Sequence, residues 1–295
     1  MIISPDFLLA LIAGIAVAAT PLVFAALGEL VVEKAGVLNL GVEGMMVVGA
    51  IAGFAGAFQT GSYTVGFCAA MAAGALAALL FGVLTQILKS NQVAAGLALT
   101  IFGLGISALV GQGYSGKSTG TFPRFGGIDV LVVLAGVLAI AIHVFLNRTR
   151  AGLVLRAVGE NHDAAHNIGY PVVRVRMLAL MFGGAMAGLG GAYLSLVQTP
   201  FWAERMTAGR GWIALALVVF ATWRPGRVVA GAYLFGGISI LQLHAQGMGL
   251  KVDAQALSML PYLATIVVLV LMSRDTGQYK QQAPASLGQS FKAPR

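Results

Sequence analysis

Two short stretches carry residue types whose spacing suits chemistry. The first is GQGYSGKS, Gly111–Ser118, which fits the phosphate-binding pattern G-x-x-x-x-G-K-[ST] at every fixed position. A P-loop needs a strand before its Gly-rich turn and a helix after it. Here an apolar helical run precedes the motif, and the TGTFPRFGG that follows disfavours a helix start. We therefore interpret the motif as a loop and Lys117 as a solvated charge.

The second stretch is AGVLNLGVEGMMVVGA, Ala35–Ala50, in which Asn39 and Glu43 stand four residues apart. On a helix these two side chains would lie one above the other on a single face. A charged side chain at the centre of a membrane helix costs about 2.5–3.5 kcal/mol, so it should face the protein interior or water and have a partner. Two interpretations stay open. Either the pair lines a transport path, or Glu43 lies near the interface, where it pairs with Lys34 or caps a helix end.

No pattern for an enzyme, a metal site or a cofactor stands out. Neither H-E-x-x-H nor G-x-S-x-G occurs, and the four histidines (His143, His162, His166 and His244) are scattered. The single cysteine, Cys68, cannot form an internal disulfide. We expect a protein that is not an enzyme.

The elements that position these residues are membrane helices. Of 295 residues, 58% are apolar and 9% are charged, and the mean hydropathy is +0.88, which predicts an all-α, polytopic membrane helix bundle. A bilayer needs about 20 apolar residues per helix. The uninterrupted runs are Phe7–Leu27, Val65–Leu88, Val93–Val110, Val130–Leu146, Met177–Val197, Val228–Leu243 and Leu257–Met272. Ala35–Phe58 and Trp212–Trp223 are interrupted or short, so we expect about nine segments (8–10), including discontinuous helices.

Details of the apolar runs add to this prediction. No Lys or Arg precedes the first run, so it is expected to be a retained helix rather than a cleaved signal peptide. Small residues at the spacing of Gly49 and Gly53, and of Gly184 and Gly188, predict helices that pack closely against one another.

Basic residues predict the orientation, so the net charge of +8 reports topology rather than nucleic-acid binding. With nine segments, one side carries only Lys117, Arg124, Arg205, Arg210 and Lys251 of the 18 Lys and Arg residues. The richer side is expected to be cytoplasmic, and it includes the C-terminus. Residues 1–273 would form the transmembrane domain, and 274–295, rich in Gln, Pro and Ala, a disordered cytoplasmic tail.

The two interrupted segments occupy similar places in the two halves of the chain. Ala35–Phe58 follows the first helix through a charged linker, Glu29–Lys34, and Trp212–Trp223 follows the sixth long run through Gln198–Gly211. Transporter sites lie where discontinuous helices meet, so this pattern favours a solute path near these segments.

The stretch Thr149–Arg176 predicts a short helix outside the membrane. Asn161 is a good N-cap, His162–Ile168 suit a helix, and Gly169 with Pro171 supply a stop. Its basic flanks are expected to lie at the anionic inner membrane surface; they are Arg148, Arg150, Arg156, Arg174 and Arg176. The alternative is a longer loop of the positive-inside type.

Several of these stretches together resemble a known family. GELVVEKAGVLNLGVEGMMVVGA (Gly28–Ala50), followed by SNQVAAGLAL (Ser90–Leu99), is similar to the permease subunits of ATP-driven importers of the branched-chain amino acid and simple sugar superfamily, nearest the nucleoside importers. Thr149–Arg176 resembles that family's coupling loop, and GRGWIALALVVFATWRPG (Gly209–Gly226) resembles its later signature. No family pattern fits the chain after Asp275.

The resemblance implies a permease in the inner or plasma membrane of a bacterial-type cell, with three kinds of partner. These are a second permease subunit, identical or different, two cytoplasmic ATP-binding-cassette (ABC) ATPase subunits, and an extracytoplasmic solute-binding protein. The expected solute is a nucleoside, with a simple sugar or a branched-chain amino acid as alternatives. The competing class is an ion-coupled secondary transporter that uses Glu43.

The resemblance and the residues together give two sets of candidate sites. The residues expected near the substrate path are Asn39, Glu43, Asn91 and Trp212. Those expected to couple to the ATPase, within the loop 148–176, are Gly159, Glu160, Asn161, Ala164, Ala165 and Gly169. Ala164 and Ala165 are small enough to let a partner surface approach closely.

Overall fold

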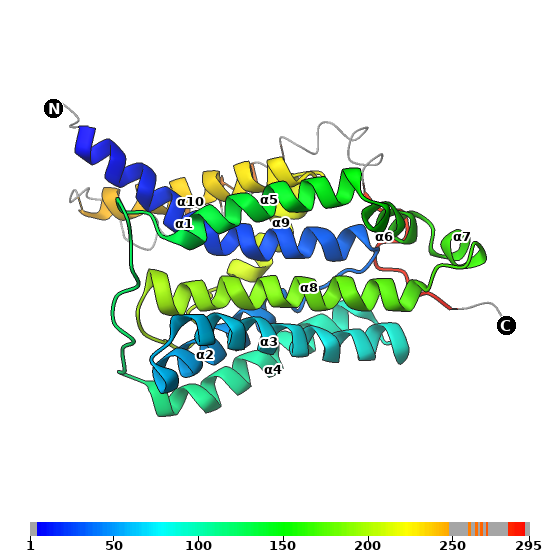
Figure 1. Ribbon diagram of the computed structural model, residues 1–295, viewed down its shortest axis with the longest axis horizontal. Coiled ribbons are helices and arrows are strands. Elements are labelled where there is room, and N and C mark those ends of the chain that lie inside the picture. The colour runs from blue at the N-terminus through cyan, green and yellow to red at the C-terminus, as the bar shows by residue number, and fades with distance from the viewer. Residues whose placement is uncertain are drawn as a thin grey trace.

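The computed structural model of the chain describes residues 5–247, 259–260, 263–264, 266–267, 270 and 283–292. These residues form helices and no strand, apart from two isolated bridges, which confirms the all-α prediction (Figure 1). The helices are α1 (Pro5–Lys34), α2 (Val42–Thr60), α3 (Tyr63–Gly82), α4 (Gln92–Gly111), α5 (Val130–Arg148), α6 (Arg150–Glu160), α7 (His162–Asn167), α8 (Val172–Tyr193), α9 (Arg210–Phe220) and α10 (Pro225–Gly247). Helices α3 and α8 continue into π-helical turns, Val83–Ile87 and Leu194–Gln198.

Seven helices within the described part of the chain are long and apolar enough to cross a membrane: α1, α2, α3, α4, α5, α8 and α10. Helix α9 is apolar but has only 11 residues. These eight helices correspond to eight of the nine predicted segments. The ninth, Leu257–Met272, lies largely outside the described residues, so the count of nine is not established.

Helix α8 lies at the centre of the bundle and packs against α1, α2 and α3. Glycines make this close approach possible, as the small-residue spacings predicted. A Cβ on Gly49 would clash with the backbone of Gly188, and one on Gly184 would clash with the carbonyl of Gly74. Without side chains at these points, backbones pack directly, and dispersion contacts hold the helices together where lipid offers no hydrophobic driving force.

The connections between helices gather at two ends of the bundle. One end, here called the basic end, holds 35–41, 88–91, 149–171, 221–224 and the C-terminal residues 283–292. Its parts touch: the Ser286 N–H donates to the Gly159 carbonyl (3.0 Å), and Gly159 abuts the end of α1. At the opposite end, the Tyr63 hydroxyl donates to the Thr119 carbonyl (2.9 Å). The loops therefore alternate as the charge pattern predicts.

The P-loop-like sequence lies in a loop at the opposite end. Helix α4 ends at Gly111, a single turn covers Gln112–Tyr114, and the next helix starts only at Val130. The Lys117 ammonium lies 5.2 Å from the centre of the Phe58 ring. A helix rather than a strand precedes the motif, so it lacks the frame that a phosphate-binding loop needs, and the loop interpretation is confirmed.

Candidate functional site

Helix α1 carries two buried carboxylates in its last turns. Glu29 is 1% exposed and Glu33 is 0% exposed. The expectation that Glu29–Lys34 form a linker is wrong, because α1 continues to Lys34 and the apolar residues between the two glutamates are buried with them. The signal was available in the sequence, since the two glutamates stand one helical turn apart and therefore share a face.

Asn39 lies in the non-helical segment between α1 and α2. Its Nδ2 donates to Glu29 Oε2 (3.1 Å), and its Oδ1 accepts from the Gly41 N–H (3.0 Å). The prediction that Asn39 and Glu43 share a helical face is wrong, because this side-chain-to-backbone turn closes before α2 begins at Val42. Asn39 instead ties the entry of α2 to α1.

Glu43, in the first turn of α2, caps the start of α9. It is 4% exposed and accepts from Thr207 Oγ1 (2.5 Å), the Gly209 N–H (2.9 Å) and the Gly211 N–H (2.6 Å). A Cβ on Gly211 would lie 2.5 Å from Glu43 Cα, so only glycine allows this approach. The carboxylate thus satisfies N–H groups that a helix start leaves unpaired. Glu43 therefore caps a helix, but the capped end is buried and belongs to α9, and the place of Glu43 on a transport path stays a prediction.

The other end of α9 is also held by a carboxylate. Trp223 Nε1 donates to Glu33 Oε2 at 2.5 Å. Thr222 and Trp223 have φ of 50° and 53°, a left-handed conformation that costs energy for non-glycine residues, in the turn between α9 and α10. We call the set Glu29, Glu33, Asn39, Glu43, Thr207, Gly209, Gly211 and Trp223 the polar seam. It joins α1, α2 and α9, so the two interrupted segments do meet.

The remaining predicted path residues lie in different surroundings. Trp212 is next to the seam on α9 and is 47% exposed. Asn91 lies at the basic end, exposed, where its Oδ1 caps α4 by accepting from the Ala94 N–H (3.0 Å). The structure therefore brings Asn39, Glu43 and Trp212 to one region and leaves Asn91 outside it.

At the basic end, α6 and α7 form the predicted coupling region. Thr149 caps α6, and Asn161 Oδ1 accepts from the Ala164 N–H (2.9 Å) to start α7. Gly169, with φ of 93°, lies just beyond the end of α7. The predicted short helix with its cap and stop is confirmed, and it ends one residue earlier than expected.

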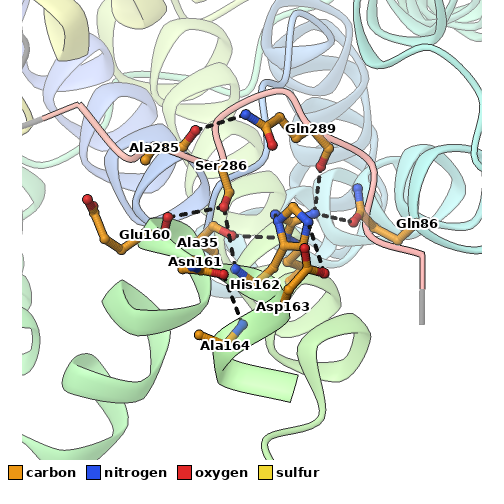
Figure 2. A network of polar contacts seen from close by, with 11 residues as sticks. Ala35, Gln86, Glu160, Asn161, His162, Asp163, Ala164, Ala285, Ser286 and Gln289 are labelled. Carbon is orange, nitrogen blue, oxygen red and sulfur yellow. Dashed lines mark hydrogen bonds and ion pairs between the residues drawn. The ribbon is translucent and has the colours of Figure 1, made fainter. Parts of the chain in front are cut away.

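Residues 283–292, here called the C-terminal clasp, pack onto the coupling region, so the expected disorder does not hold for them. Figure 2 shows Ser286 beside Glu160, Asn161 and His162, and Gln289 farther along the clasp, near Ala285. The Ser286 hydroxyl donates to the Glu160 carbonyl (3.2 Å). Phe291 is 4% exposed and packs with Val158, Ala165 and Val172. A composition rich in Gln, Pro and Ala did not signal this, because the clasp is held by backbone groups, one serine hydroxyl and one aromatic ring.

Arg176 joins the clasp to the bundle. It is 0% exposed and donates to the carbonyls of Ala35 (3.1 Å) and Gln289 (2.9 Å) and to Gln86 Oε1 (3.4 Å). Its Nη2 lies 3.3 Å from His162 Nδ1. The expectation that Arg176 meets the membrane surface is wrong, because acceptors from several separate segments enclose it. A buried guanidinium needs such acceptors to replace water.

The positive charge of Arg176 contributes to a lower pKa at two neighbouring groups, His162 and Lys89. Burial, and then Arg176, lower the pKa of His162, while Asp163 opposes the shift. The neutral ring leaves Nδ1 free to accept from Arg176. Burial, Arg176 and Lys292 likewise lower the pKa of Lys89, whose ammonium lies 5.9 Å from the Phe291 ring centre. The clasp thus lies beside the cationic side chains of Arg176 and Lys89.

The predicted coupling residues divide into two groups. Glu160, Asn161, Ala164 and Gly169 are exposed, whereas Gly159 and Ala165 are buried. A Cβ on Gly159 would clash with the Lys34 carbonyl, and Ala165 is 2% exposed beneath the clasp. Of the two alanines, Ala164 faces outward, so the expectation that both lie open to a partner is corrected for Ala165.

A bundle of long apolar helices, with the short helix α9 held inside it by the side chains of Glu33 and Glu43, defines a multi-pass membrane protein. Residues 11–272 match the family described as the permease component of branched-chain amino acid transport systems, and the chain belongs to that family. It is therefore an ABC transporter permease, a transport component rather than a catalytic subunit.

Curated relatives cover nearly the whole chain. A putative glucose ABC transporter permease of Haloferax volcanii is 42% identical over 93% of this chain and 94% of its own. A guanosine ABC transporter permease of Bacillus subtilis is 32% identical over 85% of this chain and 88% of its own. A nucleoside ABC transporter permease of Lactococcus lactis is 30% identical over 88% and 91%. No solved structure gives a significant match.

Proposed function

We propose that this permease imports a solute built on a sugar ring, with ATP hydrolysed by separate ABC subunits. The observation that carries the proposal is the exposed face of α7, held on a buried base by Gly159, Arg176 and the clasp. A short helix tied at its base transmits displacement, whereas a free loop absorbs it. Family membership supports the same role.

Glucose is the first candidate solute, because the relative named for glucose is 42% identical. A nucleoside is the second, because two relatives are named for guanosine or nucleosides. Both carry a hydroxyl-rich ring. The test is uptake of labelled glucose and of labelled guanosine by proteoliposomes that contain the permease with its ATPase and solute-binding protein. Solute uptake by the permease alone, driven by an ion gradient, would instead favour the secondary transporter.

The assembly proposed around this chain has a second permease subunit, identical or different, two ABC ATPase subunits and a solute-binding protein on the other side of the membrane. The setting is the inner or plasma membrane of a bacterial-type cell, and copurification from it identifies these partners. The membrane-facing surfaces would contact lipid.

The proposed solute path passes the junction where α2 and α9 begin. The carboxyl oxygens of Glu43 accept hydrogen bonds from the start of α9 at this junction. Trp212, one residue beyond Gly211, has an exposed ring at the same place. Aromatic faces stack on sugar rings and bases alike. W212A should reduce uptake at least tenfold while the ATPase subunits still copurify. L241A, which removes an exposed side chain from α10, is the matched control.

The proposed ATPase contact is the exposed face of α7. Because the Ala164 residue is exposed and Asn161 caps the helix through the backbone N–H of residue 164, which A164E keeps, the variant should preserve the fold and place a charge in the contact. We expect loss of ATPase copurification and at least a tenfold drop in uptake. S115E, in an exposed loop at the opposite end, should leave the two unchanged. Normal copurification of A164E would contradict the assignment.

We also propose that the basic end faces the cytoplasm. His162 is only 8% exposed, whereas the Asp163 side chain is 66% exposed and suits labelling. D163C in a Cys68→Ser background should resist a membrane-impermeant thiol reagent in intact cells and react after lysis. Labelling from outside intact cells would show the inverted orientation.

A further inference from the structure

A basic cavity of about 910 Å³ opens at the basic end. The ends of α1 and α5, the outer face of α6 and the start of α10 surround it. Figure 1 shows α5 and α10 running beside each other toward α6. Four cationic side chains line the cavity, and Glu160 is the one carboxylate among the residues that line it. The cations are Lys34, Arg156, Arg224 and Arg227.

Two further features of the lining favour an anion. Helix α10 starts at Pro225 on the cavity wall and has no acidic residue in its first turn, so its N-terminal partial positive charge is not neutralised there. Among the residues that the structure describes, Arg156 Nε is buried and has no hydrogen-bond partner. Among the residues that line the cavity, the cations outnumber the single carboxylate, Glu160, which is exposed.

The cavity lies where two membrane-exposed faces end. On α5, Val137 and Ile140 are 56% and 67% exposed, and the same stripe continues through Val144 to Asn147 in the cavity wall. On α10, exposed Leu234 lies two turns from Arg227 on the same face. Exposed apolar helix faces of this kind suit lipid tails, and a bilayer around them would place the cavity near its phosphate headgroups.

We propose that this cavity binds an anionic phosphate group. Basic pockets between helix ends on the cytoplasmic side of membrane proteins recognise phosphate headgroups by this chemistry. A lipid headgroup and free inorganic phosphate carry the same group, and only a lipid would also use the exposed faces of α5 and α10. A zwitterionic lipid carries a compensating cation and binds less tightly in a cavity with excess positive charge.

The test is native mass spectrometry of the purified full chain, released from detergent with phosphatidylglycerol or phosphatidylcholine added. Phosphatidylglycerol should bind more tightly than phosphatidylcholine. R156Q/R227Q removes two cations, each worth about fivefold in affinity near a membrane surface, so binding should weaken by about 25-fold. R150Q removes an exposed charge from the same end outside the cavity lining and should change little. R156K/R227K should restore most of the binding.

Inorganic phosphate distinguishes the two sources. If millimolar phosphate alone raises the melting temperature of the wild type but not of R156Q/R227Q, and phosphatidylglycerol shows no preference, the group comes from free phosphate. If phosphatidylglycerol binding falls in R156Q/R227Q and phosphate has no effect, the group comes from lipid. Equal binding of the two lipids with no phosphate effect would overturn the proposal, as would equal weakening by R150Q. A melting profile in detergent shows that each variant is folded.

Discussion

Glu43 in the polar seam and Arg176 at the C-terminal clasp obtain their hydrogen bonds in opposite ways. In the seam, Glu43 takes its three hydrogen bonds from the short stretch Thr207–Gly211, inside the bundle. At the clasp, Arg176 takes its contacts from Ala35, Gln86, His162 and Gln289, which belong to separate parts of the chain. One is a fixed joint between two helices, and the other is a hub that gathers several segments.

This difference has a consequence for motion. Most residues of the seam are buried, and opening it would leave backbone N–H groups at the start of α9 without acceptors inside the bundle, which is costly. The clasp lies at the surface, and its release would expose the Phe291 ring, Arg176 and a few backbone groups to water while the helices of the bundle stay packed, so it can open locally. We therefore expect seam variants to affect the whole fold and clasp variants to affect one local equilibrium.

The largest expected effect comes from E43L. It leaves the Thr207 hydroxyl and the Gly209 and Gly211 N–H groups without an acceptor in the interior, at roughly 1 kcal/mol each, or about 3 kcal/mol in all. Thermal unfolding in detergent should show a clear fall in melting temperature and a low yield. The control is E204L, which removes an exposed carboxylate at the opposite end. If E43L melted at the wild-type temperature, the inference that Glu43 stabilises the fold would be wrong.

R176Q should have an intermediate, local effect. Gln cannot reach the Ala35 and Gln289 carbonyls together, so docking of the clasp should weaken by about 2 kcal/mol, or roughly 30-fold. Hydrogen exchange of residues 283–292 should accelerate by that factor while the exchange of α8 stays slow. R174Q, an exposed neighbour on the same helix, should leave the clasp protected. Uniform acceleration across the bundle would mean that Arg176 holds the whole fold, as Glu43 does.

The smallest expected effect is a pH dependence of the clasp. Because burial and Arg176 lower the pKa of His162, the docked state binds a proton less readily than the released state, whose histidine titrates near 6.5. Docking is therefore at full strength above about pH 6.5 and weakens as the pH falls below it. Asp163, with Oδ1 3.6 Å from His162 Nε2, reduces the effect.

A nitroxide at Ala285→Cys in a Cys68→Ser background measures this equilibrium, because Ala285 is an exposed position inside the clasp. Its mobility should be higher at pH 5.5 than at pH 7.5, with a smaller change than R176Q produces. H162Q should remove the dependence, and H166Q should keep it. A response that persists in H162Q would assign the titration to another group.

The sequence by itself determined the membrane bundle, its alternating loops and the short helix α7. These features follow from local rules: the length of apolar runs, the placement of Lys and Arg, and a cap such as Asn161 with a stop at Gly169. The motifs at Gly28–Ala50 and Thr149–Arg176 also indicated the family. Each of these signals lies within a few consecutive residues, so no knowledge of the folded chain was needed to detect it.

Tertiary structure alone decided the partners of the buried polar groups. Asn39 and Glu43 looked like one helical face, but Asn39 bonds Glu29 and Glu43 bonds a stretch more than 160 residues away. The sequence predicted a surface charge at Arg176 and disorder at residues 283–292. In the structure, the Arg176 guanidinium is buried and donates a hydrogen bond to the Gln289 carbonyl in that segment. A polar group inside a membrane protein must find a partner wherever the fold brings one. That partner is set by how the helices pack, and no local pattern in the sequence records it.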